Sequence, residues 1–410
     1  MTKADYSKGR VLIIGGSMAG LFAAIMLRSR GWKVDVYERA SEELANRGAG
    51  IATHDELYKA LREAGIELRD EMGVRCYGRI MFDADGSVLG TYDMPQIMTS
   101  WGLIYRFLRE QLSADEYHNG HALVGIETSA GGVTAVFENG ARESGDWLIG
   151  ADGARSTVRT IVAPEIRNNY CGYFGWRGLI DEKLIAPEVL EAFAERLALG
   201  MAPGGHWLGY LVAGPDDALE AGRRWFNWGW YRTGDDEMLR DLLTDGSGRY
   251  HEHGIPHDLI RREHVERLRD EARQYLAPQI QAVVNATEWP FIQGMSDFGS
   301  ERLIRDRTIL IGDAAFTARP HVGLGVSKAA DDASSLARAL SDTDQATALE
   351  RWESERLAYG NAVVQWGRDL GSYIGPQPDD AAHRAKAEYH QRPEVLMAAT
   401  AASDPSRYLN

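Results

Sequence analysis

The sequence predicts an α/β protein in which a Rossmann-like nucleotide-binding domain is combined with a mixed β-sheet domain and C-terminal helices. Three observations indicate this fold: a strand-turn-helix-strand pattern over residues 11–37, a cluster of strands rich in tryptophan and tyrosine over residues 172–233, and helical spacing over residues 346–371. A chain of 410 residues exceeds what one hydrophobic core usually covers. We therefore expect two domains, either intertwined or consecutive.

The N-terminal unit is an almost complete dinucleotide-binding fingerprint. Residues 11–20 read VLIIGGSMAG, in which an apolar strand leads into a glycine turn and a helix, but serine stands at position 17, where the full G-x-G-x-x-G pattern has glycine. Serine is small enough for the backbone still to approach a pyrophosphate, whose charge the helix N-terminus stabilises. A second strand, 34–37, ends at Glu38, where a carboxylate can accept both hydroxyls of an adenosine ribose. The predicted site contains Gly15, Ser17, Met18, Ala19, Gly20, Glu38 and Arg39.

The rest of the chain alternates between strand and helix signals. We expect a β-hairpin over residues 75–91 with Asp85-Gly86 as its turn, a helix over 101–112, strands over 122–128 and 133–137, and a helical stretch over 258–284. After residue 371 the sequence looks irregular. No second fingerprint of the same kind follows a strand, so only one dinucleotide has a cradle of its own.

Composition and charge exclude several classes of protein. The formal net charge of −15 argues against a protein that binds nucleic acid or anionic membranes, because both partners require a basic surface. Cys76 and Cys171 are the only cysteines, so neither a disulfide framework nor a cysteine-rich zinc site is expected. The polar N-terminus lacks the apolar core of a signal peptide, and no apolar run reaches the roughly 20 residues of a membrane span. We expect a soluble, cytoplasmic protein.

Two later motifs share the pattern of an apolar strand that delivers an aspartate into a turn. Residues 149–159 read IGADGARSTVR and contain Asp152, and residues 309–320 read ILIGDAAFTARP and contain Asp313. Together with the N-terminal fingerprint, and in this order, the set resembles the group A flavoprotein aromatic hydroxylases, whose prototype is p-hydroxybenzoate hydroxylase. Within that group, the GGS turn, the GWRG strand and the RPH segment look most like the 2,6-dihydroxypyridine 3-hydroxylases and the related 6-hydroxynicotinate 3-monooxygenases.

The resemblance implies that the two domains are interleaved and that the dinucleotide is FAD. It implies an FAD-binding domain over residues 1–74, 101–171 and 298–345, a substrate domain over 75–100 and 172–297, and a C-terminal helical region over 346–410. Arg106 would lie near the ribityl and phosphate groups, and Asp313 would accept the ribityl hydroxyls, with a helix N-cap as its alternative role. The remaining cofactor residues carried over from the family are Asp152, Pro320, Gly323 and Gly325, the last three in a loop whose backbone amides would face the flavin ring.

The resemblance also implies a reaction. NADH or NADPH reduces FAD, dioxygen adds to give a flavin hydroperoxide, and the distal oxygen attacks an electron-rich ring carbon of a small aromatic substrate. Such a ring reacts best when a ring hydroxyl is deprotonated, so a general base with a pKa near neutral is useful, and histidine is the natural choice. The candidates are His321, which follows Pro320, His206 and Tyr210, which even spacing places on one face of a strand, and His54. For each histidine, a satisfied polar residue without substrate contact is the alternative.

Several alternatives stay open. A non-catalytic FAD-binding redox sensor is one, and a flavin-dependent halogenase is another, although its W-x-W-x-I-P segment is not matched by the run after Trp228. The absence of a second fingerprint disfavours disulfide reductases and Baeyer-Villiger enzymes.

The tryptophans of residues 225–230 could wall an aromatic pocket or pack between the sheet and the elements that cover it. The histidines of HEHGIPH (251–257) suit a flexible connection better than a metal site. The sequence is compatible with either NADH or NADPH as reductant and with a homodimer.

Overall fold

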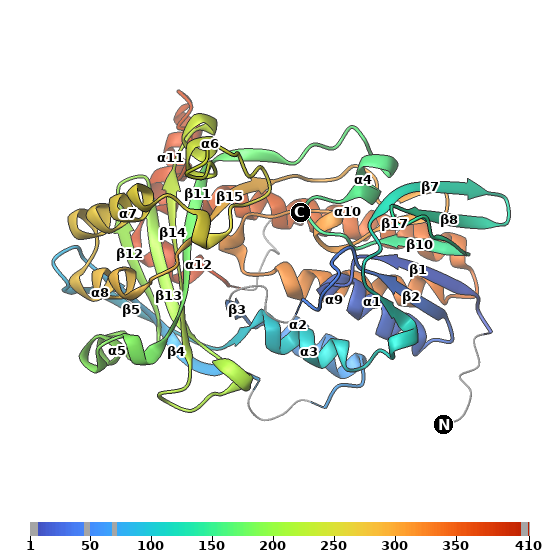
Figure 1. Ribbon diagram of the computed structural model, residues 1–410, viewed down its shortest axis with the longest axis horizontal. Helices are drawn as coiled ribbons and strands as arrows, with labels where there is room; N and C mark the ends of the chain where they lie inside the picture. Colours follow the sequence, from blue (N-terminus) through green and yellow to red (C-terminus); the bar gives the residue numbers. More distant parts are fainter. Residues whose placement is uncertain (1–6, 45–49, 68–71, 403–408, 410) are drawn as a thin grey trace.

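The protein has two lobes, each built around its own β-sheet (Figure 1). The computed structural model describes residues 7–44, 50–67, 72–402 and 409, so the polar N-terminus over residues 1–6 lies outside the described part. A six-stranded, mostly parallel sheet forms one lobe, and an eight-stranded, mostly antiparallel sheet forms the other. This arrangement confirms the predicted α/β fold, in which a nucleotide-binding domain is interleaved with a mixed-sheet domain.

The six-stranded sheet brings the three glycine motifs together. Its strand order is β16 (Ile304–Arg305), β17 (Thr308–Leu310), β10 (Trp147–Gly150), β1 (Arg10–Ile14), β2 (Lys33–Tyr37) and β6 (Tyr117–His118). Every neighbouring pair except β16 and β17 is parallel. Ile14 lies opposite Gly150, and Gly150 lies opposite Leu310. Because β1, β10 and β17 run in the same direction, the turns that follow them meet at one edge of the sheet.

Helices and a small sheet cover the two sides of the six-stranded sheet. The helices are α1 (Met18–Arg28), α9 (Gly325–Leu340) and α10 (Gln345–Leu370), which pack on one another, with α2 (Asp55–Glu63) and α3 (Trp101–Arg109) beside them. Strands β7 (Leu123–Ser129), β8 (Gly132–Phe137) and β9 (Arg142–Gly145) form a separate antiparallel sheet on the other side (Figure 1), and α4 (Thr157–Val162) follows β10. Every residue from Met18 to Leu27 is buried, so α1 has no polar stripe.

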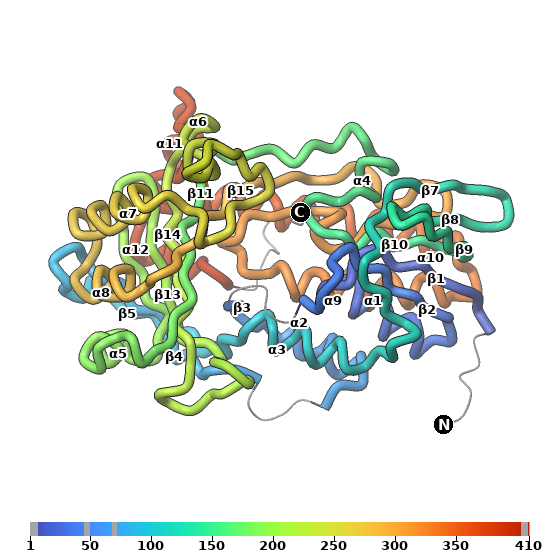
Figure 2. The backbone as a smooth tube through the Cα atoms, in the orientation of Figure 1, coloured from blue at the N-terminus to red at the C-terminus, as the bar shows by residue number. Residues whose placement is uncertain are grey.

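The eight-stranded sheet is assembled from three stretches of the chain. Its order is β15 (Phe291–Asp297), β11 (Asn169–Asp181), β14 (Trp225–Thr233), β13 (Gly205–Val212), β12 (Leu197–Ala202), β4 (Val74–Phe82), β5 (Val88–Ser100) and β3 (Gly50–Ala52). Strands β4 and β5 form the hairpin expected over residues 75–91, and Gly86 in its turn has a φ of +91°, which glycine adopts without strain. Strand β3 belongs to this sheet although it lies within the segment 1–74. Figure 2 shows the chain passing repeatedly between the two lobes.

The two faces of the eight-stranded sheet have different surroundings. Since successive residues of a strand point to opposite faces, Trp176 and Trp230 pack on one face with helices α7 (Arg262–Tyr275) and α8 (Pro278–Ala286), whereas Arg177 and Tyr231 point to the other. Trp228 shares the core with Trp230, so both tryptophans pack between the sheet and its helical cover and do not wall a pocket. The expected helical stretch over 258–284 is two helices, because Pro278 begins the second one.

The chain stays helical beyond residue 371. Helix α10 ends at Leu370 as expected, but α11 (Ala381–His390) and α12 (Pro393–Ala399) follow, so the expectation of irregular structure there is wrong. These helices are short, and most of their stability comes from packing. Leu396 and Met397 join the hydrophobic core on the face of the eight-stranded sheet to which Tyr231 points. Two other short helices, α5 (Pro187–Phe193) and α6 (Asp236–Leu242), border that sheet. None of the described helices is both long enough and apolar enough to cross a bilayer.

Candidate active site

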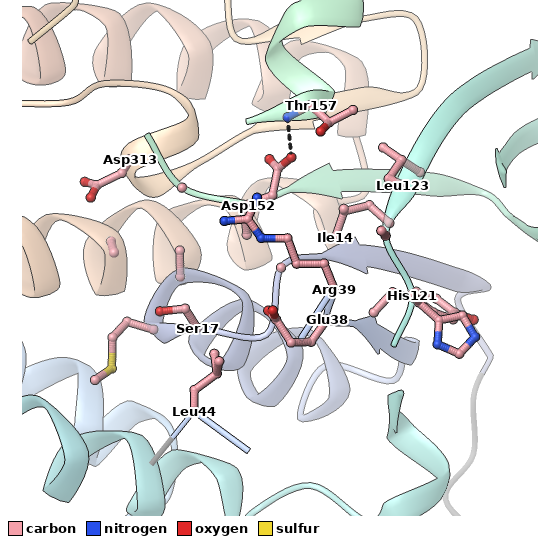
Figure 3. A pocket seen from close by; sticks show the side chains of 18 of the residues that line it. Ile14, Ser17, Glu38, Arg39, Leu44, His121, Leu123, Asp152, Thr157 and Asp313 are labelled. Carbon is pink, nitrogen blue, oxygen red and sulfur yellow. Dashed lines mark hydrogen bonds between the residues drawn. The ribbon is translucent and has the colours of Figure 1, made fainter. Parts of the chain in front are cut away.

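The glycine turn after β1 forms part of the wall of a cavity of about 520 Å³ (Figure 3). The wall contains most of the predicted cofactor residues, namely Gly15, Ser17, Met18, Ala19, Glu38, Arg39, Asp152, Asp313 and Gly325. They come from the ends of β1, β2, β10 and β17 and from the starts of α1 and α9. His121, Leu123 and Trp101 also line the wall and had no motif that would have predicted them.

Close backbone contacts require glycine at two positions of the turn. Gly15 has a φ of +106°, and a Cβ atom there would lie 2.4 Å from the carbonyl oxygen of Ala151. A Cβ atom at Gly20 would lie 1.9 Å from the carbonyl oxygen of Gly15. Ser17 has a φ of −93°, which any residue adopts. The geometry therefore explains why the turn accommodates serine at the middle position of the fingerprint.

The N-terminus of α1 offers free backbone donors to this cavity. The first intrahelical bond runs from the N–H of Leu21 to the carbonyl of Ser17, at 2.9 Å. The N–H groups of residues 18–20 therefore precede the hydrogen-bonded ladder of the helix. No acidic side chain lies in the first turn to occupy them. This arrangement is suited to an anionic group such as a pyrophosphate.

Glu38 and Arg39 supply one charge of each sign to the same cavity. Glu38 is buried, and its carboxylate accepts the N–H groups of Gly16 at 2.8 Å and Ala40 at 2.9 Å, which leaves lone pairs on both oxygens for further donors. Arg39 reaches across the cavity toward Asp152 in Figure 3 and forms no ion pair with the residues described by the structure. Arg39 therefore supplies local positive charge to this cavity in a chain whose formal net charge is −15.

Asp313 lies where the first cavity meets a second one of about 350 Å³. The two cavities share Asp313, Gly325 and Val326 in their walls, so they adjoin at this aspartate. The carboxylate of Asp313 accepts no hydrogen bond within the described residues, and it does not cap a helix. Its side chain opens into the cavity while protein surrounds it, and this desolvation raises the pKa of Asp313.

A buried ion pair holds the turn that carries Asp313. Lys328 and Asp332, one turn apart on α9, form an ion pair of 2.9 Å. Asp332 accepts the N–H of Gly312 at 2.9 Å, and the ammonium group of Lys328 donates to the carbonyl of Gly312 at 3.0 Å. The two side chains therefore fix both polar groups of the residue before Asp313, and the aspartate is presented to the cavity on a rigid turn.

The second cavity lies between the loop that precedes α9 and the face of the eight-stranded sheet to which Arg177 and Tyr231 point. Its wall includes Pro320, His321, Gly323 and Gly325 from the loop and the start of α9, Arg177, Tyr210 and Tyr231 from the sheet, and Thr400 and Ala401 from the C-terminal segment. The structure thus brings two of the four predicted catalytic residues into one cavity wall: His321, in the predicted flavin-side loop, and Tyr210, on the sheet.

His321 from the loop before α9 and Tyr210 from the sheet both line this second cavity. His321 is buried, and its Nε2 lies 2.9 Å from the hydroxyl of Tyr173 on β11, whereas its Nδ1 has no partner within the described residues. Tyr210 lies on β13, and its hydroxyl forms no hydrogen bond with the part of the chain that the structure describes. Both side chains therefore retain unfilled hydrogen-bonding capacity, and Nδ1 of His321 is itself a buried atom.

His206 and His54 lie behind the cavity wall and do not line it. His206 is fully buried, and its Nδ1 lies 2.6 Å from the hydroxyl of Tyr373. His54 precedes α2, and its Nε2 lies 3.2 Å from the carbonyl oxygen of Gly323 in the flavin-side loop. Sequence spacing placed His206 and Tyr210 on one face of β13, as the structure has them, but only Tyr210 reaches the cavity.

Burial controls the protonation of these groups. Desolvation lowers the pKa of His321 well below its usual value, and nearby His206, Arg319 and Arg177 lower it further. Burial alone lowers the pKa of His206 to about 3. Burial also raises the pKa of Tyr210. At neutral pH the cavity therefore presents uncharged histidine and tyrosine side chains.

Two predicted cofactor residues have partners within the protein. The carboxylate of Asp152 accepts the N–H groups of Thr157 at 2.7 Å, drawn in Figure 3, and Val158 at 3.1 Å, so it caps α4. Burial raises the pKa of Asp152. Arg106 forms an ion pair with Asp217 and lines neither cavity. The motif at Asp152 thus shapes the cavity edge, while the expected ribityl contact of Arg106 stays a prediction.

Arg177 and Tyr231 were missed as site residues. Both alternate with tryptophans on strands whose other face is apolar, and that alternation is the signal that could have found them.

Elsewhere, His251 of the HEHGIPH segment lies 2.7 Å from Asp245. Within the described residues, no group of three or more histidine, cysteine, aspartate or glutamate side chains could hold a metal ion.

The joined cavities fit FAD. The two adjoining cavities carry helix N–H donors, a cation and a ribose-type carboxylate at one end, an aspartate without a partner in the described residues in the middle, and a second compartment at the other end. This sequence of groups matches the order adenosine, pyrophosphate, ribityl chain and ring system. The fold and the site therefore define a dinucleotide-binding flavoprotein.

Comparisons with known proteins agree with this class. The chain is 33% identical over 367 residues to 2,6-dihydroxypyridine 3-monooxygenase of Paenarthrobacter nicotinovorans, covering 89% of this chain and 91% of the relative. It is 25% identical over 387 residues to 6-hydroxynicotinate 3-monooxygenase of Pseudomonas fluorescens, covering 88% and 90%. The solved structure of 2,6-dihydroxypyridine-3-hydroxylase from Arthrobacter nicotinovorans matches with a TM-score of 0.84 and 30% identity, covering 92% of this chain and 96% of that one. A family model described as FAD binding domain-like matches residues 170–297.

The chain belongs to the family of FAD-dependent aromatic-ring monooxygenases. This confirms the resemblance drawn from the three motifs, the FAD cofactor and the hydroxylase activity. The redox sensor and the halogenase are not supported. The matched residues 170–297 lie in the eight-stranded sheet and its helical cover, whereas the nucleotide fingerprint lies in the other lobe.

Proposed function

We propose that this monooxygenase hydroxylates a single pyridine or benzene ring that already carries a hydroxyl group, with NADH or NADPH as reductant. The observation that carries the proposal is the second cavity, where a neutral histidine, two tyrosines and an arginine surround a space of about 350 Å³ beside the FAD site. Polar groups at several points of the wall suit a ring with polar substituents. The relatives named for dihydroxypyridine and hydroxynicotinate support this substrate class.

We assign the cofactor contacts as follows. The N–H groups at the start of α1 and the guanidinium of Arg39 hold the pyrophosphate, Glu38 accepts the adenosine ribose hydroxyls, and Asp313 accepts the ribityl hydroxyls. The loop with Pro320, Gly323 and Gly325 faces the ring system. When bound and reduced, FAD supplies the chemistry that inserts one oxygen atom of O2 into the substrate ring.

Two cavity residues prepare the substrate ring for this reaction. With Nε2 protonated and donating to Tyr173, the Nδ1 atom of His321 holds the lone pair that can accept the proton of a ring hydroxyl. Loss of that proton leaves the electron pair on the ring substituent and makes the ring carbon a better nucleophile. The hydroxyl of Tyr210 stays protonated because burial raises its pKa, and it donates a hydrogen bond to a ring heteroatom.

His206 and His54 act as positioning residues in this proposal. His206 holds Tyr373 of the C-terminal region, and its ring packs 5.5 Å from that of His321, measured between ring centroids. His54 holds the carbonyl of Gly323 in the flavin-side loop. Neither needs to touch the substrate to affect the reaction.

A screen of hydroxypyridines and hydroxybenzoates tests the proposed function. Holoenzyme is mixed with NADH or NADPH and each ring compound, and reductant consumption, H2O2 release and product mass are measured. We expect at least one hydroxylated ring to accelerate reductant consumption and to gain 16 mass units, the mass of one oxygen atom, roughly one product per reductant. The matching rings without a hydroxyl group serve as controls. Stimulation without any hydroxylated product across the whole set would contradict the proposal.

We also propose a cytoplasmic location. Both cysteines, Cys76 and Cys171, are free thiols, which supports a reducing compartment.

The homodimer expected as one option is tested by light scattering of the purified holoenzyme. A mass twice the monomer mass of 45.4 kDa would support the homodimer, and the monomer mass would exclude it.

A further inference from the structure

Arg177 places a guanidinium group on the wall of the second cavity. It lies on β11, directly after Trp176, whose side chain enters the apolar core on the opposite face. In the neighbouring strand β14, Gly229 lies opposite Arg177, and a Cβ atom at Gly229 would lie 3.2 Å from Nη1 of the arginine. Glycine at this register position leaves space for the arginine side chain along the sheet.

The guanidinium group has only part of its hydrogen-bonding capacity filled. Nη2 donates to the hydroxyl of Tyr231 at 3.2 Å, and the guanidinium carbon lies 5.4 Å from the centroid of that ring. Nε is buried and has no partner within the described residues. An arginine has five N–H donors and cannot lose its charge in a protein, so buried donors without acceptors are costly.

The other cations of this wall have acidic partners, and Arg177 has none in the described part of the chain. Arg319 forms an ion pair of 2.7 Å with Asp297, and Lys328 forms one of 2.9 Å with Asp332. Asp313 is at the far end, where the two cavities join. The charge of Arg177 is thus available to a ligand.

The titratable groups that face Arg177 do not neutralise it. Tyr231 on β14 and Tyr210 on β13 stay protonated, because burial raises the pKa of both hydroxyls. His321 in the loop before α9 is uncharged, because burial lowers its pKa. A ligand that enters this compartment therefore meets the positive charge of Arg177 among neutral polar groups, while the carboxylate of Asp313 lies at the end where the two cavities join.

We propose that Arg177 binds the ring substituent oxygen of the substrate in its deprotonated, anionic form and so selects hydroxylated rings. The inference rests on the proposed function, because it names the charge state that the substrate takes in the same cavity. The O–H bond of the ring hydroxyl breaks, its proton passes through His321 to water so that the imidazole ends uncharged, and its electron pair stays on the oxygen that Arg177 holds. A charge-assisted hydrogen bond of this kind is about twice as strong as a neutral one.

Equilibrium binding without reductant tests the proposal apart from turnover. The probe is 2,6-dihydroxypyridine, added to the holoenzyme in the absence of NADH and NADPH; flavin absorbance gives its dissociation constant, and its own ultraviolet difference spectrum gives its ionisation state. We expect the bound probe to be anionic at a pH where most of the free probe is neutral. The neutral analogue 2,6-dimethoxypyridine should bind more weakly.

Three variants separate charge from fold. Arg177→Gln should weaken binding of the probe roughly 10- to 100-fold and abolish the shift in its ionisation, while hardly changing the affinity for the dimethoxy analogue. Arg177→Lys, which keeps the charge, should lie between the two. Arg232→Gln is the matched control, because Arg232 lies on β14 but pairs with Glu271 outside the cavity, and it should bind the probe like the wild type. FAD content and Tm are measured for each variant.

Two results would overturn the assignment. The first is wild-type affinity and wild-type ionisation of the probe in an Arg177→Gln variant that retains FAD. The second is a ring carboxylate such as picolinate that binds as tightly as the dihydroxypyridine and loses as much affinity in the variant, since the site would then recognise carboxylates in general. Failure of the proposed hydroxylation is a separate result, because it is read only in the presence of reductant.

Discussion

The Nε2 atom of His321 lies 2.9 Å from the hydroxyl oxygen of Tyr173, and both side chains are buried. The bond joins the loop after β17 to strand β11 across 148 residues of sequence. It therefore fixes the imidazole ring at the boundary between the nucleotide-binding lobe and the substrate lobe. With Nε2 engaged, the reactivity of His321 depends on Nδ1.

Replacement of His321 by alanine should remove most hydroxylation and leave FAD binding intact. Loss of a general base costs about 10²- to 10⁴-fold in rate, and the imidazole is not needed to hold the cofactor. Product formed per reductant consumed and flavin absorbance measure the two effects. His264→Ala is the control, because His264 is a buried histidine on α7, away from both cavities. Unchanged coupled turnover in His321→Ala would remove this residue from the reaction.

Replacement of Asp313 by asparagine should weaken FAD retention. The carboxylate has no partner within the described residues, so its lost acceptor capacity falls entirely on the cofactor, and we expect the dissociation constant to rise by about 10- to 100-fold. Fluorescence titration of apoprotein with FAD measures it. Asp306→Asn, an exposed aspartate in the turn before β17, should bind FAD normally. Equal affinities for the two variants would contradict the assignment of Asp313.

We expect Arg39, but not Arg106, to contact the phosphate groups of the cofactor. Arg39 lines the first cavity without an acidic partner in the described chain, whereas Arg106 pairs with Asp217. We expect Arg39→Gln to weaken FAD binding several-fold more than Arg106→Gln, and the effect to diminish at high salt, because a phosphate contact is screened. A larger loss in Arg106→Gln would mean that this arginine leaves Asp217 when the cofactor binds.

Thr400 and Ala401 of the C-terminal segment line one side of the second cavity. The N–H of Ala401 donates to the carbonyl of His321 at 2.9 Å, and Nε2 of Gln96 donates to the carbonyl of Ala401 at 3.0 Å. Gln96→Ala should loosen this wall, admit water and divert reductant oxidation from hydroxylation to H2O2 release. The ratio of H2O2 to hydroxylated product measures it, with Gln111→Ala on the nucleotide-binding lobe as the control. An unchanged ratio would show that the segment does not exclude water.

Buried neutral histidines predict a loss of stability in mild acid. In the folded protein, burial lowers the pKa of His206 to about 3, whereas an unfolded histidine has a pKa of about 6.5. Below about pH 6.5 the unfolded state binds a proton that the folded state excludes, so the free energy of unfolding falls by up to about 1.4 kcal/mol per pH unit for this residue. Above that pH the contribution is constant.

Urea unfolding of the holoenzyme between pH 7.5 and pH 5.5 checks this dependence. His206→Asn should flatten the slope, and His253→Asn, which changes an exposed histidine, should not. The carboxylates with lowered pKa, such as Asp297, lose their contribution only at still lower pH, so they do not mask the effect in this window. An identical slope in His206→Asn and wild type would show that His206 is not the group that titrates.

Much of the nucleotide site could be predicted from the chain alone. Gly15 and Glu38 lie within 24 residues of one another in a strand-turn-helix-strand unit, and local periodicity and turn chemistry encode such a unit directly. The strand cluster over 172–233 was equally visible, since alternation identifies strands. The helices after residue 371 were missed because short helices owe their stability to the core they join, and that core lies on β4 and β5.

The sequence by itself determined the order of the elements, the face to which each strand residue points, and the positions where only glycine fits the turn. Tertiary structure alone decided which polar residues reach the ligand. His54 meets Gly323 across 269 residues, and Arg106 meets Asp217 across 111, so both are held by distant partners. Arg177 lies in the cavity with Tyr231 as its distant partner and without an acidic partner in the described residues. Contacts of this kind depend on how two sheets pack together, and no local pattern in the chain records that packing.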